Sequence, residues 1–262
     1  MFEAGAIAAA LAEFLPSRDA VSFVDAGCGD GRFAQLLADV GRQTWTPKVG
    51  IDRDVIRLIK ARETFSRLVS AELDSIPLAI ASVDLAICNS TLEHVVNVEG
   101  ALRELSRVLR PGGLLVLTVP SVDFESQLFG YRIRAWSGRS AAAAAWARAK
   151  SDRIQHLHYY PLARWCELLE QAGLQLRAAR EIVPAPAVTI ADPLQWIRDH
   201  NIGGSRYSRR IPTGEARDLP FRLIRIGAIA VEWLLCTALA ALPGNKENGR
   251  FGGYLLVASH AE

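Results

Sequence analysis

Three glycines at alternate positions follow a short apolar run near the start of the chain. The run Val21–Val24 is followed by Asp25, and the glycines are Gly27, Gly29 and Gly31. A helical apolar pattern begins after them. The order strand, glycine turn, helix is how an open α/β sheet forms a cradle for a ligand. Glycine lets the backbone turn sharply and leaves out the Cβ atoms that would block that ligand.

The spacing of these glycines differs from that of a dinucleotide-binding loop. That fingerprint requires G-x-G-x-x-G. Counted from Gly27, its third glycine would stand at position 32, which is Arg32 in this chain. A nucleotide-dependent oxidoreductase is therefore disfavoured, although the sequence leaves it open as an alternative.

Acidic side chains follow two later apolar runs. Asp52 ends the run that begins at Val49, and Glu72 and Asp74 come after the run Leu68–Ala71. In open α/β sheets, ligands bind outside the carboxyl ends of the strands. We therefore expect these carboxylates to lie near the glycine loop.

Three histidines are candidates for proton transfer. His94 stands just beyond the apolar run Val83–Cys88, and His156 and His158 follow in a later segment. An imidazole titrates near neutral pH and can take the proton of a hydroxyl. We predict His94 and His158 as the catalytic candidates. Histidines and carboxylates do not fall at metal-ligand spacing along the chain, so the sequence predicts no metal site.

The elements that must position these residues alternate along the chain. Apolar runs alternate with helical patterns, which predicts an α/β fold with a Rossmann-like, doubly wound, mostly parallel sheet and helical inserts. The predicted strands are Val21–Val24, Val49–Asp52, Leu68–Ala71, Val83–Cys88, Leu114–Val119, Leu174–Val183 and Tyr254–Ser259. The predicted helices are Met1–Leu15, Gly31–Val40, Asp54–Phe65, Val98–Leu109 and Leu162–Ala172.

The glycine loop and four later segments together resemble the class I S-adenosylmethionine-dependent methyltransferases, in particular their small-molecule branch, type 11. The segments are Gly50-Ile51-Asp52, Glu72-Leu73-Asp74-Ser75-Ile76-Pro77, Ser82-Val83-Asp84 with the Asn89–Val95 stretch beyond it, and Ala101–Gly113. The resemblance covers residues 20–120 and continues more weakly at His156–Gly173. It implies seven strands with the last one antiparallel, and S-adenosyl-L-methionine as the cofactor.

The resemblance also implies where the cofactor is held. The three glycines shape the methionine site, Asp25 supports their loop, Asp52 holds the ribose, and Glu72 holds the adenine with Asp74 as its rival. The expected cofactor-binding residues are Asp25, Gly27, Cys28, Gly29, Gly31, Asp52, Arg53, Glu72, Leu73 and Asn89.

Composition and motifs exclude several kinds of partner. The chain of 262 residues carries a net charge of +2, which gives no general attraction to nucleic acid. Asn89 is followed by Ser90-Thr91 rather than by the N-P-P-Y continuation of nucleic-acid amino-methyltransferases, so no nucleic-acid partner is predicted. Four scattered cysteines without a C-x-x-C pair fit a reducing cytoplasm. The segment Met1–Leu15 has no basic start, so we predict a helix rather than a signal peptide.

Two long segments interrupt the alternation of strands and helices. We predict a single domain over 1–262, with a cofactor-binding half at 1–121, a substrate-shaping insert at 122–160 and a helical insert at 184–253.

The second insert contains an apolar helix predicted at 221–242. It is long enough to suggest a membrane span, but one crossing would leave the last strand on the wrong side of the bilayer. Upstream, residues 198–225 hold seven arginines and three acids, 7 − 3 = +4. A core or homodimer-interface helix, and peripheral contact of 198–242 with the inner face of the membrane, both remain open.

The predicted activity is methyl transfer to a small or lipophilic acceptor, with a hydroxyl as the favoured group and a lipid-linked molecule as one form of it. Alternatives that stay open are N- or C-methyl transfer to a natural-product-type substrate, and a degenerate domain that serves as a scaffold. The intact acidic residues count against the scaffold, because a decayed site has no need of them.

Overall fold

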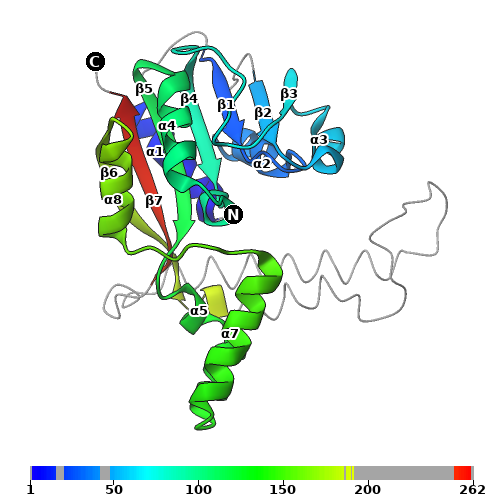
Figure 1. The fold of residues 1–262 in the computed structure, drawn as a ribbon, viewed down its shortest axis with the longest axis vertical. Helices are drawn as coiled ribbons and strands as arrows, with labels where there is room; N and C mark the ends of the chain where they lie inside the picture. Colours follow the sequence, from blue (N-terminus) through cyan, green and yellow to red (C-terminus); the bar gives the residue numbers. More distant parts are fainter. Residues whose placement is uncertain are drawn as a thin grey trace, which may run out of the picture. The chain divides into compact units, whose positions relative to one another are not determined.

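The computed structural model describes residues 2–15, 21–41, 48–185, 187–189, 191 and 251–260. Its centre is a seven-stranded sheet with the strand order β3-β2-β1-β4-β5-β7-β6 (Figure 1). Strands β3, β2, β1, β4 and β5 pair in parallel, and β7 runs antiparallel to β5. The predicted doubly wound sheet with an antiparallel last strand is thereby confirmed. The strands are β1 Phe23–Ala26, β2 Lys48–Asp52, β3 Arg67–Ser70, β4 Val83–Asn89, β5 Leu109–Pro120, β6 Leu174–Pro184 and β7 Phe251–His260.

Helices cover both faces of this sheet. Figure 1 shows α1 and α2 on one face and α4 on the other. The apolar side chains of α4 and α8, Trp165 among them, join those of the central strands in one buried core. The helices are α1 Phe2–Phe14, α2 Arg32–Gly41, α3 Val55–Ala61, the short 3-10 helix η1 Leu92–His94, α4 Val98–Val108, α5 Phe124–Gln127, α6 Phe129–Trp136, α7 Ser140–Ile154 and α8 Leu162–Gln171.

Several boundaries differ from those predicted, and three of them show why. β1 begins at Phe23, where pairing with Lys48 begins, and it extends past the apolar run because the polar Asp25 pairs with Gly50 inside the sheet. α3 ends at Ala61 rather than at Phe65, since the chain turns there and buries the Phe65 ring. β5 begins at Leu109, where an extended backbone pairs with Val83, so the strand precedes the glycine turn that was expected to open it.

Polar side chains begin the helices beside the site. The Asp54 carboxylate accepts hydrogen bonds from the backbone N–H groups of Ile56 and Arg57, at 2.9 and 3.2 Å, and so caps α3. The Asn97 side chain accepts from the Gly100 N–H at 3.0 Å and caps α4. Such caps satisfy donors that the first helical turn leaves open, which fixes where each helix starts.

The chain divides into two compact units. The first comprises Met1–Val122, Ser151–Ile182 and Gly253–Glu262, and the second comprises Asp123–Lys150 and Val183–Gly252. The second unit is drawn from the two segments that interrupt the alternation in the sequence. Within it, Gly130 lies directly against the Trp146 indole, where a Cβ atom would come within 2.2 Å of the ring.

The helix predicted at 221–242 lies outside the described residues, as does the basic stretch before it. Among the helices that the structure does describe, none combines the length and the apolar character needed to cross a membrane.

Candidate active site

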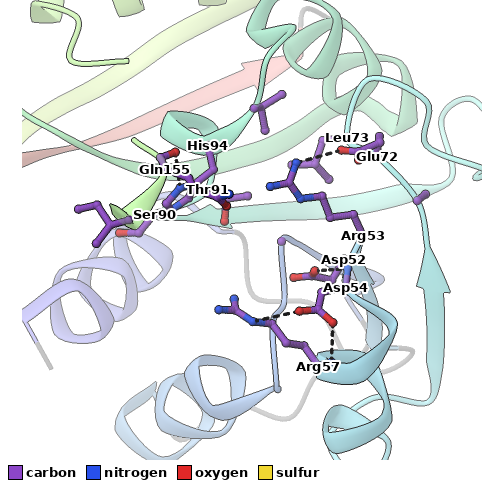
Figure 2. A pocket seen from close by; sticks show the side chains of 14 residues that line it. Asp52, Arg53, Asp54, Arg57, Glu72, Leu73, Ser90, Thr91, His94 and Gln155 are labelled. Carbon is purple, nitrogen blue, oxygen red and sulfur yellow. Dashed lines mark hydrogen bonds and ion pairs between the residues drawn. The ribbon is translucent and has the colours of Figure 1, made fainter. Parts of the chain in front are cut away.

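A cavity of about 260 Å³ lies at the carboxyl ends of β1, β2 and β4 (Figure 2). Its volume is close to the lower end of the roughly 300–1,000 Å³ that is typical of small-molecule sites. The position is the edge at which open parallel sheets bind ligands. The lining residues are Gly27, Asp52, Arg53, Asp54, Arg57, Ala71, Glu72, Leu73, Ser90, Thr91, His94, Val95, Ile154 and Gln155.

Asp52 connects the glycine loop to the end of β2. One carboxylate oxygen, Oδ2, accepts a hydrogen bond from the Gly29 N–H at 2.8 Å, and Oδ1 accepts one from the Asp54 N–H at 2.8 Å. A carboxylate has about four lone-pair sites. Asp52 therefore fixes the loop and still has capacity to accept hydrogen bonds from a ligand in the cavity.

The three glycines of the loop serve different purposes. All have positive φ, but a Cβ atom on Gly27 would come within 2.3 Å of the Thr91 side chain, and one on Gly31 within 2.8 Å of the Thr64 hydroxyl. At Gly29 a Cβ atom would meet only the Arg57 guanidinium, at 3.8 Å. The missing Cβ atoms of Gly27 and Gly31 therefore leave room for threonine side chains, and Gly27 also lines the cavity. That the three glycines shape a ligand site stays a prediction.

Glu72 and Asp74, which the sequence left as rivals, have separate surroundings. Glu72 lines the cavity, and one of its carboxylate oxygens lies 4.0 Å from the Arg53 guanidinium. Asp74 instead accepts a hydrogen bond from the Asn97 amide at 3.2 Å and is not among the lining residues. Glu72 is therefore the carboxylate that a ligand at this wall would meet.

An ion pair on α4 holds the segment that carries Glu72. The Arg107 guanidinium donates to the carbonyl oxygens of Ile76 and Leu78, at 2.8 and 2.9 Å. Glu104 accepts from the Ile76 N–H at 2.8 Å and from Arg107, and this bond with Arg107 lowers the pKa of Glu104. Sequence reasoning missed this support, although both residues lie in a segment that carries the resemblance.

Asp25 is buried beneath the loop. It is 2% exposed, and its Oδ2 has no hydrogen-bond partner within the described part of the chain. Burial, together with the nearby Asp52 charge, raises the pKa of Asp25 to about 7. Burial likewise raises the pKa of the Cys28 thiol, which is therefore a packed side chain and not a reactive one.

The predicted cofactor residues thus fall into two groups. Those that line the cavity are Gly27, Asp52, Arg53, Glu72 and Leu73. Those that lie outside its lining are Asp25, Cys28, Gly29, Gly31 and Asn89, the last of which accepts a hydrogen bond from the Thr118 hydroxyl at 2.9 Å.

The two predicted catalytic histidines are also separated. His94 lines the cavity, and its Nδ1 lies 3.0 Å from the Gln155 carbonyl oxygen. A carbonyl can only accept, so this bond places a proton on Nδ1, and in a neutral ring Nε2 is then an acceptor. His158 is not among the lining residues, and its Nε2 donates to the Val95 carbonyl at 2.8 Å.

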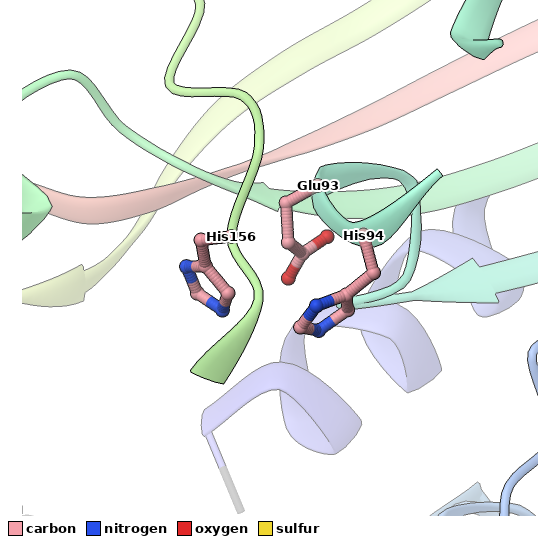
Figure 3. A group of neighbouring side chains, drawn as sticks. All are labelled: Glu93, His94 and His156. Carbon is pink, nitrogen blue, oxygen red and sulfur yellow. The ribbon is translucent and has the colours of Figure 1, made fainter. Parts of the chain in front are cut away.

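The fold brings two further residues next to His94. Glu93 and His156 lie beside it, although His156 is far along the chain (Figure 3). The spacing along the sequence predicted no such group, because a hydrogen-bonded approach of two distant segments leaves no periodic signal.

Comparison with known proteins identifies the fold family. The family described as methyltransferase domain matches residues 2–179. Malonyl-(acyl-carrier protein) O-methyltransferase of Enterobacter lignolyticus is 34% identical over 44% of this chain and 45% of its own length. A Mycobacterium tuberculosis protein named "Probable S-adenosylmethionine-dependent methyltransferase" is 34% identical over 40% of this chain and 38% of its own. Trans-aconitate 2-methyltransferase of Variovorax paradoxus is 30% identical over 70% of this chain and 69% of its own.

The aligned part of the chain therefore spans less than half of the first two relatives. Solved structures extend the likeness of fold over nearly the whole chain. The cyclase SpnF superposes with a TM-score of 0.59 at 17% identity, covering 98% of this chain and 81% of that one. Phosphoethanolamine N-methyltransferase 2 of Haemonchus contortus, solved in complex with S-adenosyl-L-methionine, gives a TM-score of 0.59 at 14% identity, covering 97% and 52%.

The residues of the cavity fit that cofactor. A nucleoside offers hydroxyl and amino donors, and the wall presents the carboxylates of Asp52 and Glu72 as acceptors. Family match, relatives, strand order and donor set agree, and the chain belongs to the class I S-adenosylmethionine-dependent methyltransferases of the small-molecule type.

Proposed function

We propose that this methyltransferase acts on an oxygen atom, a hydroxyl of a small or lipophilic acceptor. The observation that carries the proposal is the His94 imidazole in the wall of the same cavity that Asp52 and Glu72 line. The cofactor, when bound, supplies a methyl group on a positively charged sulfur. The protein then has to orient two reactants and accept one proton.

The acidic residues orient the cofactor in this proposal. Asp52 accepts hydrogen bonds from the ribose hydroxyls, and Glu72 accepts one from the adenine amino group. Hydrogen bonds fix both positions. The Gly29 N–H donates to the Asp52 carboxylate, and Arg107 donates to the Ile76 carbonyl in the segment that carries Glu72. Orientation of this kind can contribute roughly 7–11 kcal/mol to lowering a barrier.

His94 receives the proton of the acceptor hydroxyl. Its hydrogen bond to the Gln155 carbonyl sets the ring so that Nε2 is the basic nitrogen. A relative that is named an O-methyltransferase supports oxygen as the acceptor atom.

The lipophilic character of the acceptor is proposed from the sequence. The apolar helix expected at 221–242 and the arginines before it would place the enzyme on an anionic membrane surface. Co-sedimentation with anionic vesicles tests this. Protein that stays in the supernatant, together with full activity on a lipophilic acceptor after deletion of 221–242, would refute it.

Two measurements test the proposed reaction. Calorimetric titration with S-adenosylhomocysteine and with NAD should show binding of the first alone. Screening of hydroxyl, amine and carbon acceptors with methyl-labelled cofactor should give product on oxygen, and label on nitrogen or carbon would overturn that assignment.

The variant pair His94→Gln and His158→Gln then tests the assigned proton acceptor. Loss of a general base costs about 10²–10⁴ in rate, so His94→Gln should lower kcat by that order while S-adenosylhomocysteine affinity is kept. His158 does not line the cavity and donates to the Val95 carbonyl, so the His158→Gln variant should retain most of its activity.

A further inference from the structure

Glu93, His94 and His156 present a carboxylate and two imidazoles whose candidate ligand atoms all lie within 4.8 Å of one another. Figure 3 shows the Glu93 carboxylate between the two rings. We infer that these three side chains form a binding site for a divalent transition-metal ion such as Zn²⁺. Two imidazoles and one carboxylate are a ligand set that zinc uses in sites with an open coordination position.

The two segments that carry the cluster are joined by hydrogen bonds on both sides of it. The Leu157 N–H donates to the Glu93 carbonyl at 2.7 Å, and His158 Nε2 donates to the Val95 carbonyl at 2.8 Å. His94 Nδ1 donates to the Gln155 carbonyl at 3.0 Å. These bonds hold His156 opposite η1 and so keep the three candidate ligands together.

Each histidine has one ring nitrogen engaged by a neighbouring oxygen. His94 Nδ1 bonds the Gln155 carbonyl, and His156 Nδ1 lies 2.9 Å from the Tyr159 hydroxyl. Histidines that ligate metals almost always have such an outer partner, which fixes the tautomer and the orientation of the ring. The ring centroids of His94 and His156 lie 4.8 Å apart, edge to face.

Glu93 supplies a second and independent indication. Its side chain is 2% exposed, and its Oε2 has no hydrogen-bond partner among the residues that the structure describes. A buried carboxylate without a compensating partner is costly, and a cation at the cluster would provide that partner.

The ion would lie beside the cavity, because His94 belongs both to the three-residue cluster and to the cavity lining. A hydroxyl bound to such an ion loses its proton more readily than a free one. The ion would then perform the deprotonation assigned above to the imidazole alone. Only this role rests on the proposed function; the existence of the site does not, since it can be measured without an acceptor.

The test uses full-length protein without an affinity tag, stripped of metal with a chelator and titrated with Co²⁺. We expect one Co²⁺ per chain with intense visible d–d absorption, displaced by an equivalent of Zn²⁺. Glu93→Gln and His156→Gln should each weaken binding by at least the 10–100-fold that altered metal sites typically lose. Asp74→Asn, which alters a carboxylate outside the cluster and the cavity lining, should bind as the wild type does.

Absence of the band in the wild type, or a Glu93→Gln protein that keeps wild-type affinity, would overturn the inference. Circular dichroism checks that each variant folds. If Glu93→Gln does not fold, the affinity of His156→Gln for Co²⁺ decides the case. S-adenosylhomocysteine titration of the same samples keeps the outcomes separate. Cofactor binding without Co²⁺ binding refutes the metal site and leaves the methyltransferase assignment untouched.

Discussion

The Asp52 carboxylate accepts a hydrogen bond from the backbone N–H of Gly29 across 2.8 Å. This contact ties the loop after β1 to the end of β2, the strand beside it in the sheet. The loop therefore keeps its shape through a side chain that also lines the cavity. Removal of the Asp52 side chain is therefore expected to lower cofactor affinity and to alter the loop conformation at the same time.

Replacement of Asp52 by alanine should weaken S-adenosylhomocysteine binding by about 10–100-fold, because hydrogen bonds to a charged group are worth about 1.5–3 kcal/mol. Isothermal titration calorimetry measures the change. Asp74→Ala is the matched control, since Asp74 contacts Asn97 outside the cavity lining. Equal affinities for the two variants would contradict the role proposed for Asp52.

Gly27→Ala should destabilise the protein more than Gly112→Ala does. Both glycines have positive φ, +84° and +70°, so either alanine carries a backbone cost of roughly 1–2 kcal/mol. Only at Gly27 does the new Cβ atom collide with a neighbour, Thr91, which adds about 1–3 kcal/mol of overpacking. Urea unfolding of the two variants measures the difference, and a Gly112→Ala protein that is the less stable of the pair would refute the packing argument.

Asp25→Asn should become more stable relative to the wild type as the pH rises. Burial raises the pKa of Asp25 from 3.8 to about 7 in the folded protein. The folded state therefore holds its proton where the unfolded state has lost it, so the wild type loses stability between about pH 4 and about pH 7. The amide has no such proton, and the variant should gain on the order of 3–4 kcal/mol over this window. Each pH unit between the two pKa values is worth about 1.4 kcal/mol, and less close to either pKa. Unfolding free energies of both proteins at the two ends of the window give this number, and a pH-independent difference would contradict it.

Asp84→Asn should show the opposite dependence on pH. Burial alone would raise the pKa of Asp84, but hydrogen bonds from Ser22 and Arg110 outweigh it and lower the pKa. Both Ser22 donors and the Arg110 guanidinium reach the same oxygen, Oδ2, at 3.0, 2.6 and 2.8 Å. The charged side chain therefore stabilises the fold above about pH 4, and this contribution is lost as the pH falls through the lowered pKa.

At neutral pH the Asp84→Asn variant should lose about 1–3 kcal/mol of unfolding free energy, and the loss should shrink in acid. Thermal or urea unfolding at neutral and acidic pH measures it. Arg110→Met removes one of the three donors and should reproduce part of the effect, while a deficit that persists in acid would show that packing and not charge is responsible.

The sequence by itself determined the sheet and the ligand edge of this protein. When strands alternate with helices, only a few chain topologies allow the helices to bury both faces of a parallel sheet. The family resemblance selected one of these topologies. Asp52, the last residue of β2, was expected near the glycine loop because a sequence pattern shows where a buried strand ends, and it lies there. Strand and helix ends were less certain, as at Leu109, because pairing with Val83 overrode the local helical pattern.

Only the tertiary structure decided how side chains distant in the chain meet. It separated Glu72 from Asp74, assigned two of the loop glycines to Thr91 and Thr64, and placed His158 outside the cavity lining. It also set His156 against Glu93 and His94. These relations depend on directional hydrogen bonds and packing between segments whose separation along the chain carries no periodic pattern, so they appear only once the chain has folded.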